Sequence, residues 1–147
     1  MKIRKGIKED LPQVLDLINE LAEYEKALDQ VINTVELMER DGFGSHPLFG
    51  FFVAEEKDIV GISLYYYRYS TWKGKRLYLE DIIVTESERG KGIGKHLFDA
   101  TIEYGKANNC TGMVWQVLDW NEPAINFYQK YYQADLDDEW INCSIDW

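Results

Sequence analysis

One turn of the chain combines glycines with positive charges. Arg89-Gly90-Lys91-Gly92-Ile93-Gly94 follows an apolar, strand-like run and precedes a helical pattern. Unpaired backbone N–H groups and the positive dipole end at a helix start can bind phosphate, and glycine lets the backbone approach the anion closely. Arg89 and Lys91 add charge, and Lys95 lies in the next helical turn. The spacing is neither the G-x-G-x-x-G dinucleotide fingerprint nor a P-loop. We predict an anion-binding turn; the alternative is a flexible turn that only caps the helix.

The strand pattern before this turn, residues 76–84, is interrupted by two carboxylates. Glu80 and Asp81 stand in an otherwise apolar run. A carboxylate can attract a cation or accept a proton. Because successive strand residues point to opposite faces, the two can line one cleft only if a β-bulge intervenes. The alternative is a pair of ordinary solvated strand carboxylates.

The remaining nucleophilic and metal-binding residue types are few. The two cysteines, Cys110 and Cys143, and the two histidines, His46 and His96, have no metal-ligand spacing, so we predict no metal site. Neither cysteine has a histidine close in sequence that could activate it. We therefore expect both to be buried thiols rather than nucleophiles.

The elements that must position these residues predict an α+β fold, a mixed sheet with helices, in one domain spanning residues 1–147. Asp10 is the expected cap of the first helix, with Gln13 completing a capping box, and Thr34 the expected cap of the second. Helical spacing predicts helices at residues 11–24, 35–41, 93–109 and 123–131. Alternation and β-branched content predict strands at residues 49–55, 59–69, 76–84, 113–118 and 140–146.

Composition limits the possible partners. The 147 residues are 46% hydrophobic, which is typical of a globular chain, and carry 16 basic against 26 acidic side chains, a net charge of −10. This charge disfavours nucleic acid and favours cationic small molecules. No run approaches the ~20 apolar residues of a membrane span, so no membrane partner is expected. Two lone thiols and the lack of an apolar leader predict a cytoplasmic protein.

Two motifs of the chain are the Arg89-x-x-Gly92-x-Gly94 signature after the run Leu79–Val84 and the later run Asn121-Glu122-Pro123-Ala124-Ile125-Asn126-Phe127-Tyr128. Both resemble the GNAT superfamily of acetyl-CoA dependent N-acetyltransferases. Further motifs are similar to its spermidine/spermine (diamine) acetyltransferase branch. They are Asp41–Pro47, the turn Trp72–Lys75, Tyr78–Asp81 and Trp120–Pro123. The likeness extends from about Ile3 to Trp140.

This resemblance implies a GNAT fold, a central mixed twisted sheet flanked by helices, and direct transfer of an acetyl group from acetyl-CoA to a primary amine without a metal. Such an amine has a pKa near 10.4 and must lose a proton before it attacks. Glu80 is the candidate base, and the resemblance implies a bulge beside it. Tyr128 matches the tyrosine to which the family assigns the general acid that protonates the leaving thiolate. Without the motif, Tyr128 would be read as a core aromatic.

The predicted site residues fall into two groups besides the catalytic pair. The coenzyme-binding residues are Ile82, Val84, Arg89, Gly90, Lys91, Gly92, Ile93, Gly94, Lys95, Asn121 and Tyr128. The residues expected to bind a small cationic amine through charge and cation–π contacts are Tyr24, Glu25, Trp72, Glu80, Asp81 and Trp120. For each acidic residue the alternative is a solvated surface carboxylate.

The chain also departs from the branch. Ser70 and Thr71 replace an acidic residue and a proline before Trp72, Lys73 adds a positive charge, and the chain stops at Trp147 before the branch's C-terminal extension. These differences leave a short diamine, a lysine-like amino acid or another small amine open as acceptor and put long polyamines in question. The alternatives are a peptide or protein amine acetyltransferase and a non-catalytic module that binds acyl-CoA or polyamines. The resemblance and the aromatic run Tyr65–Tyr69 predict a homodimer.

Overall fold

The computed structural model describes all residues, 1–147, as two compact units, Met1–Trp115 and Gln116–Trp147, and each unit is described by itself. The first unit contains one five-stranded sheet in the order β1-β2-β3-β4-β5. Its first four strands are antiparallel neighbours, whereas β5 pairs with β4 in parallel, so the sheet is mixed as predicted. The strands are β1 (Lys2–Lys5), β2 (Gly50–Glu55), β3 (Ile59–Ser70), β4 (Gly74–Val84) and β5 (Met113–Val114).

Three helices belong to the first unit and one to the second. They are α1 (Leu11–Tyr24), α2 (Val35–Phe43), α3 (Ile93–Ala107) and α4 (Glu122–Tyr132). Short 3-10 turns are η1 (Lys8–Asp10), η2 (Leu28–Gln30) and η3 (Glu86–Glu88). The predicted helices are confirmed, and so is the cap of α2, where Thr34 Oγ1 accepts from Leu37 N at 3.1 Å. None of the helices combines the length and the apolar character that a membrane span requires.

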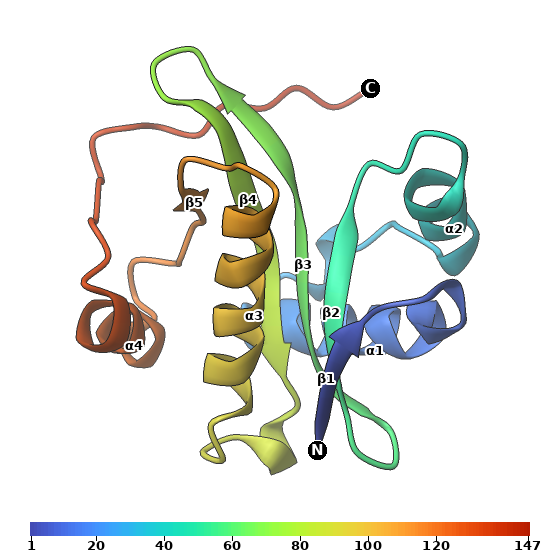
Figure 1. Cartoon of the computed structure of the whole chain (residues 1–147). Helices are drawn as coiled ribbons and strands as arrows, with labels where there is room; N and C mark the ends of the chain where they lie inside the picture. The colour runs from blue at the N-terminus through green and yellow to red at the C-terminus, as the bar shows by residue number, and fades with distance from the viewer. The chain divides into compact units, whose positions relative to one another are not determined.

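The two faces of the sheet are covered by different helices. On one face, α1 and α2 form a core with β2, β3 and β4 that includes Leu11, Val14 and Met38. On the other face, Ile93 and Leu97 of α3 form a second cluster. Figure 1 shows α3 in front of the sheet and α1 behind it. Since strand side chains alternate, each strand residue belongs either to the α1 face or to the α3 face.

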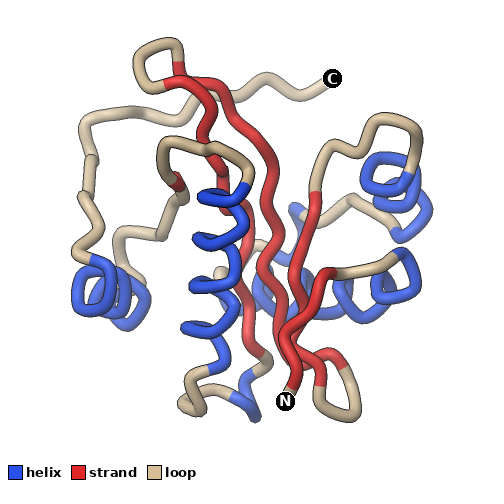
Figure 2. Tube along the Cα trace, viewed as in Figure 1, coloured by secondary structure: helices blue, strands red, loops and turns tan.

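The hairpin β3–β4 is the longest part of the sheet. Its strands have 12 and 11 residues, and its Ser70–Gly74 turn extends beyond the ends of the helices (Figure 2). By contrast, the ladder between β4 and β5 consists of two pairs, Leu77 with Met113 and Tyr78 with Val114. The prediction of a strand over residues 113–118 is therefore correct in place but too long. The ladder ends just before an irregularity in β4, and such irregularities disrupt pairing.

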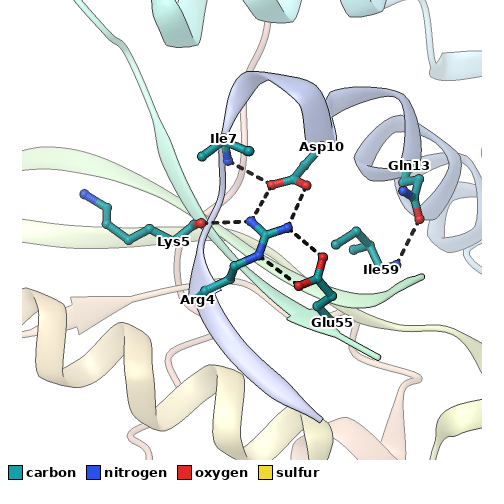
Figure 3. A network of polar contacts seen from close by, with 7 residues as sticks. All are labelled: Arg4, Lys5, Ile7, Asp10, Gln13, Glu55 and Ile59. Atoms are coloured by element: carbon teal, nitrogen blue, oxygen red, sulfur yellow. Dashed lines mark hydrogen bonds and ion pairs between the residues drawn. The ribbon is translucent and has the colours of Figure 1, made fainter. Parts of the chain in front are cut away.

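The N-terminal segment differs most from its prediction. It forms β1, which the hydrophobic pattern does not reveal, and Asp10 does not cap α1. The Asp10 carboxylate instead accepts from Arg4 Nη1 at 2.8 Å and Nη2 at 2.9 Å and from Ile7 N at 2.9 Å (Figure 3). Arg4 Nη2 also donates to Glu55 Oε2 at 3.0 Å. A charge-assisted bidentate bond is stronger than a cap, which explains why the cap is lost.

The expected partner of that cap has a different role as well. Gln13 Oε1 accepts from the backbone N–H of Ile59 at 2.9 Å and so ties α1 to the start of β3 (Figure 3). The capping-box prediction is therefore wrong, because a partner 46 residues away in the sequence competes for this side chain. Asp10 and Gln13 thus join the start of α1 to β1 and β3.

The second unit consists of α4 and an extended tail. The predicted strand at residues 140–146 is wrong, because the tail contains no strand. Asp137 accepts from Glu139 N and from Trp140 Nε1, both at 3.0 Å, and this local turn takes the place of a ladder. Both cysteines were expected to be buried, but Cys143 is exposed and Cys110 is half-buried in the turn after α3.

Candidate active site

A β-bulge in β4 organises the predicted carboxylates. Leu64 of β3 lies opposite Asp81 and Tyr65 lies opposite Leu79, so Glu80 is an extra residue in β4. Before the bulge, Leu77 packs against Gly105 of α3. After the bulge, the alternation is reversed, and Ile83 belongs to the core on the α1 face. The bulge that the resemblance implied is therefore confirmed, and it turns Asp81 to the α1 face.

Glu80 and Asp81 share this face. The Tyr66 hydroxyl, from β3, donates to Glu80 Oε2 at 3.2 Å, and the negative charges of Glu80 and Glu25 both act on Asp81. Glu25 is the residue directly after α1. The structure thus brings three predicted residues, Glu25, Glu80 and Asp81, into one acidic group. Sequence reasoning missed Tyr66, because its contact with Glu80 depends on the bulged register.

Burial sets the protonation of this group. It raises the pKa of Asp81 to about 6, with smaller contributions from the charges of Glu80 and Glu25. Burial also raises the pKa of the Glu25 carboxyl above its usual value. The group has a free-energy cost for each negative charge it carries, and a bound cation would lower that cost.

The predicted anion-binding turn begins α3. Gly90 and Gly92 adopt positive φ angles of 83° and 82°, and a Cβ atom built on either would have no other atom within 4 Å. The space above these glycines is therefore open to a ligand. Ile93, also predicted to bind the coenzyme, is buried in the cluster beneath α3 and anchors the helix start. Gly94 follows it, with its Cβ position 3.7 Å from Val84 Cγ2.

The basic residues of this turn are held by the protein itself. Arg89 Nε donates to the carbonyl of Val84 at 2.9 Å, and its guanidinium carbon lies 5.5 Å from the centre of the Tyr24 ring. Lys91 pairs with Glu88 at 2.7 Å, and Lys95 pairs with Asp99 at 3.0 Å. The cations are thus positioned beside the turn.

The edge of β4 between the acidic group and this turn faces no strand. Because the β5 ladder ends at Tyr78, the backbone from Leu79 to Val84 is unpaired on that side of β4. The side chains of Ile82 and Val84, both predicted to bind the coenzyme, pack beside Ile93 and Leu97 on the α3 face. An extended ligand could bind this edge through backbone hydrogen bonds.

One predicted substrate residue lies away from the acidic group. Trp72 is 89% exposed at the β3–β4 turn. Glu80 is six residues further along β4 than Gly74, a separation of roughly 20 Å in an extended strand. Tyr24, by contrast, ends α1 next to Glu25 and contacts Arg89.

Three further predicted residues belong to the second unit. Asn121 caps α4 by accepting from Ala124 N at 3.4 Å, and Trp120 is half-exposed just before it. Tyr128 is buried in α4, with its ring centre 5.5 Å from that of Phe127. Burial raises the pKa of Tyr128 to about 12, so its phenol is protonated at neutral pH.

Comparison with known proteins adds independent findings. The model of the acetyltransferase (GNAT) family matches residues 12–132. The chain is 41% identical over 143 residues to thialysine N-epsilon-acetyltransferase of Bos taurus, covering 91% of this chain and 84% of that protein. It is 38% identical over 146 residues to spermidine/spermine N(1)-acetyltransferase-like protein 1 of Homo sapiens, covering 94% of this chain and 21% of that protein.

Solved structures share the fold. An aminoglycoside acetyltransferase, meta-AAC0020 from an uncultured soil metagenomic sample, in complex with sisomicin, superposes with a TM-score of 0.81 at 22% identity, covering 99% of this chain and 96% of that chain. Aminoglycoside N-acetyltransferase AAC(6')-Iy in complex with CoA superposes with a TM-score of 0.75 at 18% identity, covering 97% and 93%. At these identities the likeness establishes the fold alone.

Proposed function

The chain belongs to the acetyltransferase (GNAT) family and is an acyltransferase, and we propose that it transfers the acetyl group of acetyl-CoA to a primary amine of a small cationic acceptor. The acceptor class is a polyamine, a diamine or a lysine-like amino acid. The observation that carries this proposal is the bulge at Glu80, which turns Glu80 and Asp81 to one face beside Glu25. The names of the relatives, which act on thialysine and spermidine or spermine, support the same class.

The acidic group binds the ammonium and takes its proton. A cation between Glu25, Glu80 and Asp81 offsets their mutual repulsion. Glu80 accepts the proton, directly or through water, while its other contact, the Tyr66 hydroxyl, fixes its orientation. The pKa of the neighbouring Asp81 is about 6, so at neutral pH its carboxylate is mostly charged and adds negative charge beside Glu80.

The glycine-rich turn binds the diphosphate of the coenzyme. The backbone N–H groups of Gly90, Lys91 and Gly92 are its donors, since the space at Gly90 and Gly92 is open, and Arg89, Lys91 and Lys95 supply positive charge. The unpaired edge of β4, including Ile82 and Val84, binds the extended arm that leads to the thioester. Acetyl-CoA supplies an activated carbonyl carbon at the end of that arm.

Transfer is direct. The amine nitrogen forms a bond to the carbonyl carbon and the carbon–sulfur bond breaks. Glu80 holds the proton that the ammonium lost before the attack, and the nitrogen loses its second proton as the amide forms. A thiol has a pKa near 8.5 and a phenol a higher one, so the phenol gives its proton to the leaving sulfur only as the second proton of the nitrogen restores the phenol. Tyr128 is that phenol, and Asn121 and Trp120 bind coenzyme and acceptor respectively.

A coenzyme A release assay across acceptors tests this proposal. We expect turnover with thialysine, lysine or a short diamine, and a loss of kcat of about 10-fold or more in Tyr128→Phe with an unchanged Kd for acetyl-CoA. Exclusive turnover of a peptide amine would contradict the small-amine acceptor. Tight binding of acetyl-CoA with no turnover on any amine would identify a binding module instead.

We also propose a homodimer. Tyr67 and Tyr69 of β3 are 48% and 76% exposed, and such aromatic side chains are enriched at protein interfaces. Sedimentation velocity should give the mass of two chains; the mass of one chain would contradict the proposal. Cytoplasmic location and the exclusion of nucleic acid stay predictions from composition.

A further inference from the structure

Glu20 is a carboxylate of α1 that lies outside the acidic group. Glu20 lies four residues before Tyr24, on the same side of the helix, and is half-buried. Its Oε1 and Oε2 accept from the Thr85 hydroxyl at 3.2 and 3.0 Å, and Oε1 also accepts from the backbone N–H of Glu86 at 3.0 Å. Thr85 directly follows β4, and Glu86 begins η3. Glu20 therefore holds the chain at the point where it leaves the sheet.

The segment that Glu20 holds leads straight into the glycine-rich turn. Glu88 N and Arg89 N donate back to the carbonyls of Thr85 and Glu86 at 3.0 and 3.2 Å, so η3 is a tight unit that transmits the position of its first residue. Thr85 N is itself bonded to the carbonyl of Val60 of β3 at 2.9 Å. Sheet, α1 and η3 thus meet at one residue, Thr85.

Beyond η3 the turn has little packing of its own. No atom lies within 4 Å of a Cβ position at Gly90 or Gly92, so side-chain contacts cannot fix these two residues. The fixed points on either side are the Glu20 bonds before η3, the Arg89 bond to Val84, and the buried Ile93 that starts α3. Backbone amides bind an anion well only when their direction is set beforehand.

We propose that Glu20 is a positioning residue for the coenzyme: through Thr85 and Glu86 it fixes the glycine-rich turn so that the turn's amides converge on the diphosphate. This inference rests on the proposed function, since it needs the turn to bind acetyl-CoA.

Charge makes the proposal distinctive. A carboxylate near a diphosphate site repels the ligand, so electrostatics alone predicts that neutralising Glu20 tightens coenzyme binding. A positioning role predicts weaker coenzyme binding in Glu20→Gln. Glutamine keeps one oxygen, whereas the Thr85 hydroxyl and the Glu86 N–H use both oxygens of the carboxylate. Asp16→Asn is the matched control: it removes one negative charge from an exposed position one helical turn earlier in α1.

The experiment measures the Kd of coenzyme A by calorimetry, together with KM for acetyl-CoA, KM for the amine and kcat. We expect Glu20→Ala to raise the Kd and the KM for acetyl-CoA about tenfold, the equivalent of ~1.4 kcal/mol, and Glu20→Gln to raise them by a smaller factor. kcat at saturation and KM for the amine should stay within about twofold, since only ground-state binding of the coenzyme changes. Thr85→Val should reproduce the effect, and Thr85→Ser, which keeps the hydroxyl, should restore binding.

Three results would overturn the proposal. They are unchanged or tighter coenzyme binding in Glu20→Ala, an equal loss in Asp16→Asn, and a uniform loss of kcat and both KM values that follows a lowered melting temperature. Glu20→Gln and Thr85→Ser keep the test decisive if the alanine variant folds poorly. If the unaltered protein binds no coenzyme A, the proposed function itself fails, which is a separate outcome.

Discussion

Two groups of carboxylates in the first unit differ in one respect, the presence of an arginine. Asp10 and Glu55 flank Arg4 and share its guanidinium, and this pairing holds the pKa of both carboxyls below their usual values. Glu25, Glu80 and Asp81 have no such partner, and burial raises the pKa values of Glu25 and Asp81. Carboxylates therefore stabilise the fold in the group around Arg4, whereas in the group of Glu25, Glu80 and Asp81 their negative charge has no basic side chain to balance it. Negative charge that no basic side chain balances can bind a cationic substrate.

The largest expected effect sharpens this contrast in activity. Glu80→Gln should lower kcat by about 100-fold, because positioned proton transfer contributes about 100-fold or more. The measurement is steady-state coenzyme A release with saturating amine. Glu55→Gln is the control from the paired group and should leave kcat unchanged. Equal kcat values for Glu80→Gln and the unaltered enzyme would remove Glu80 from the mechanism.

Substitutions in the group of Arg4, Asp10 and Glu55 should change the free energy of unfolding rather than the activity. Arg4→Met leaves the buried Asp10 without a counter-charge and should lower the free energy of unfolding at pH 7 by about 2 kcal/mol. Since the pKa of Asp10 is lowered on folding, its contribution is present above its unfolded pKa of about 3.9 and is lost as the pH falls through the lower folded value. Urea titrations at pH 7 and pH 3 check both points. Arg40→Met, in an exposed pair with Asp41, should not move the midpoint.

The pH dependence of activity separates the groups again. With the pKa of Asp81 at about 6, kcat/KM for the amine should fall about tenfold per pH unit below pH 6 as Asp81 takes up a proton. A pH profile in Asp81→Asn should lose or shift this acid limb. An identical limb in that variant would show that another group titrates there.

The smallest effect has the opposite sign to that of Arg4. The folded pKa of Asp81, about 6, lies above its unfolded value, so the charged carboxylate destabilises the fold as the pH rises from about 4 through 6. Asp81→Asn should therefore raise the free energy of unfolding by about 1 kcal/mol at pH 7 and leave it unchanged at pH 4. Urea titration at the two pH values measures this. A destabilised variant at pH 7 would mean that Asp81 is paired after all.

The sequence predicted those parts of the molecule that depend on local pattern. The helix ends, the cap at Thr34 and the strand-turn-helix crossover follow from propensity and spacing over a few residues. Alternation along the strand showed only that Glu80 and Asp81 could share one face if a bulge intervened, and the resemblance implied that bulge, which the register of β3 and β4 confirms. The resemblance predicted an acetyltransferase of the GNAT family, and the match to the family model confirms it.

The remaining features depend on contacts between distant residues. Arg4 meets Glu55 across 51 positions and Glu20 meets Thr85 across 65, and no pattern within a short window encodes either pair. The same limit explains the wrong cap at Asp10 and the wrong strand at residues 140–146. The alternating pattern of residues 140–146 is typical of a strand, but a strand forms only where a neighbouring strand can pair with it.

The single extra residue in β4 has a consequence for how tolerant this strand is to length changes. Deleting Glu80 would make Leu79–Tyr65 and Asp81–Leu64 consecutive pairs, so the hairpin register would become continuous and the other side chains of β4 would keep their faces. Asp81 would remain on the α1 face opposite Leu64, and Ile83 would remain in the core on that face. The loss of one residue at the bulge would therefore remove a carboxylate from the acidic group and leave the packing of both faces in place.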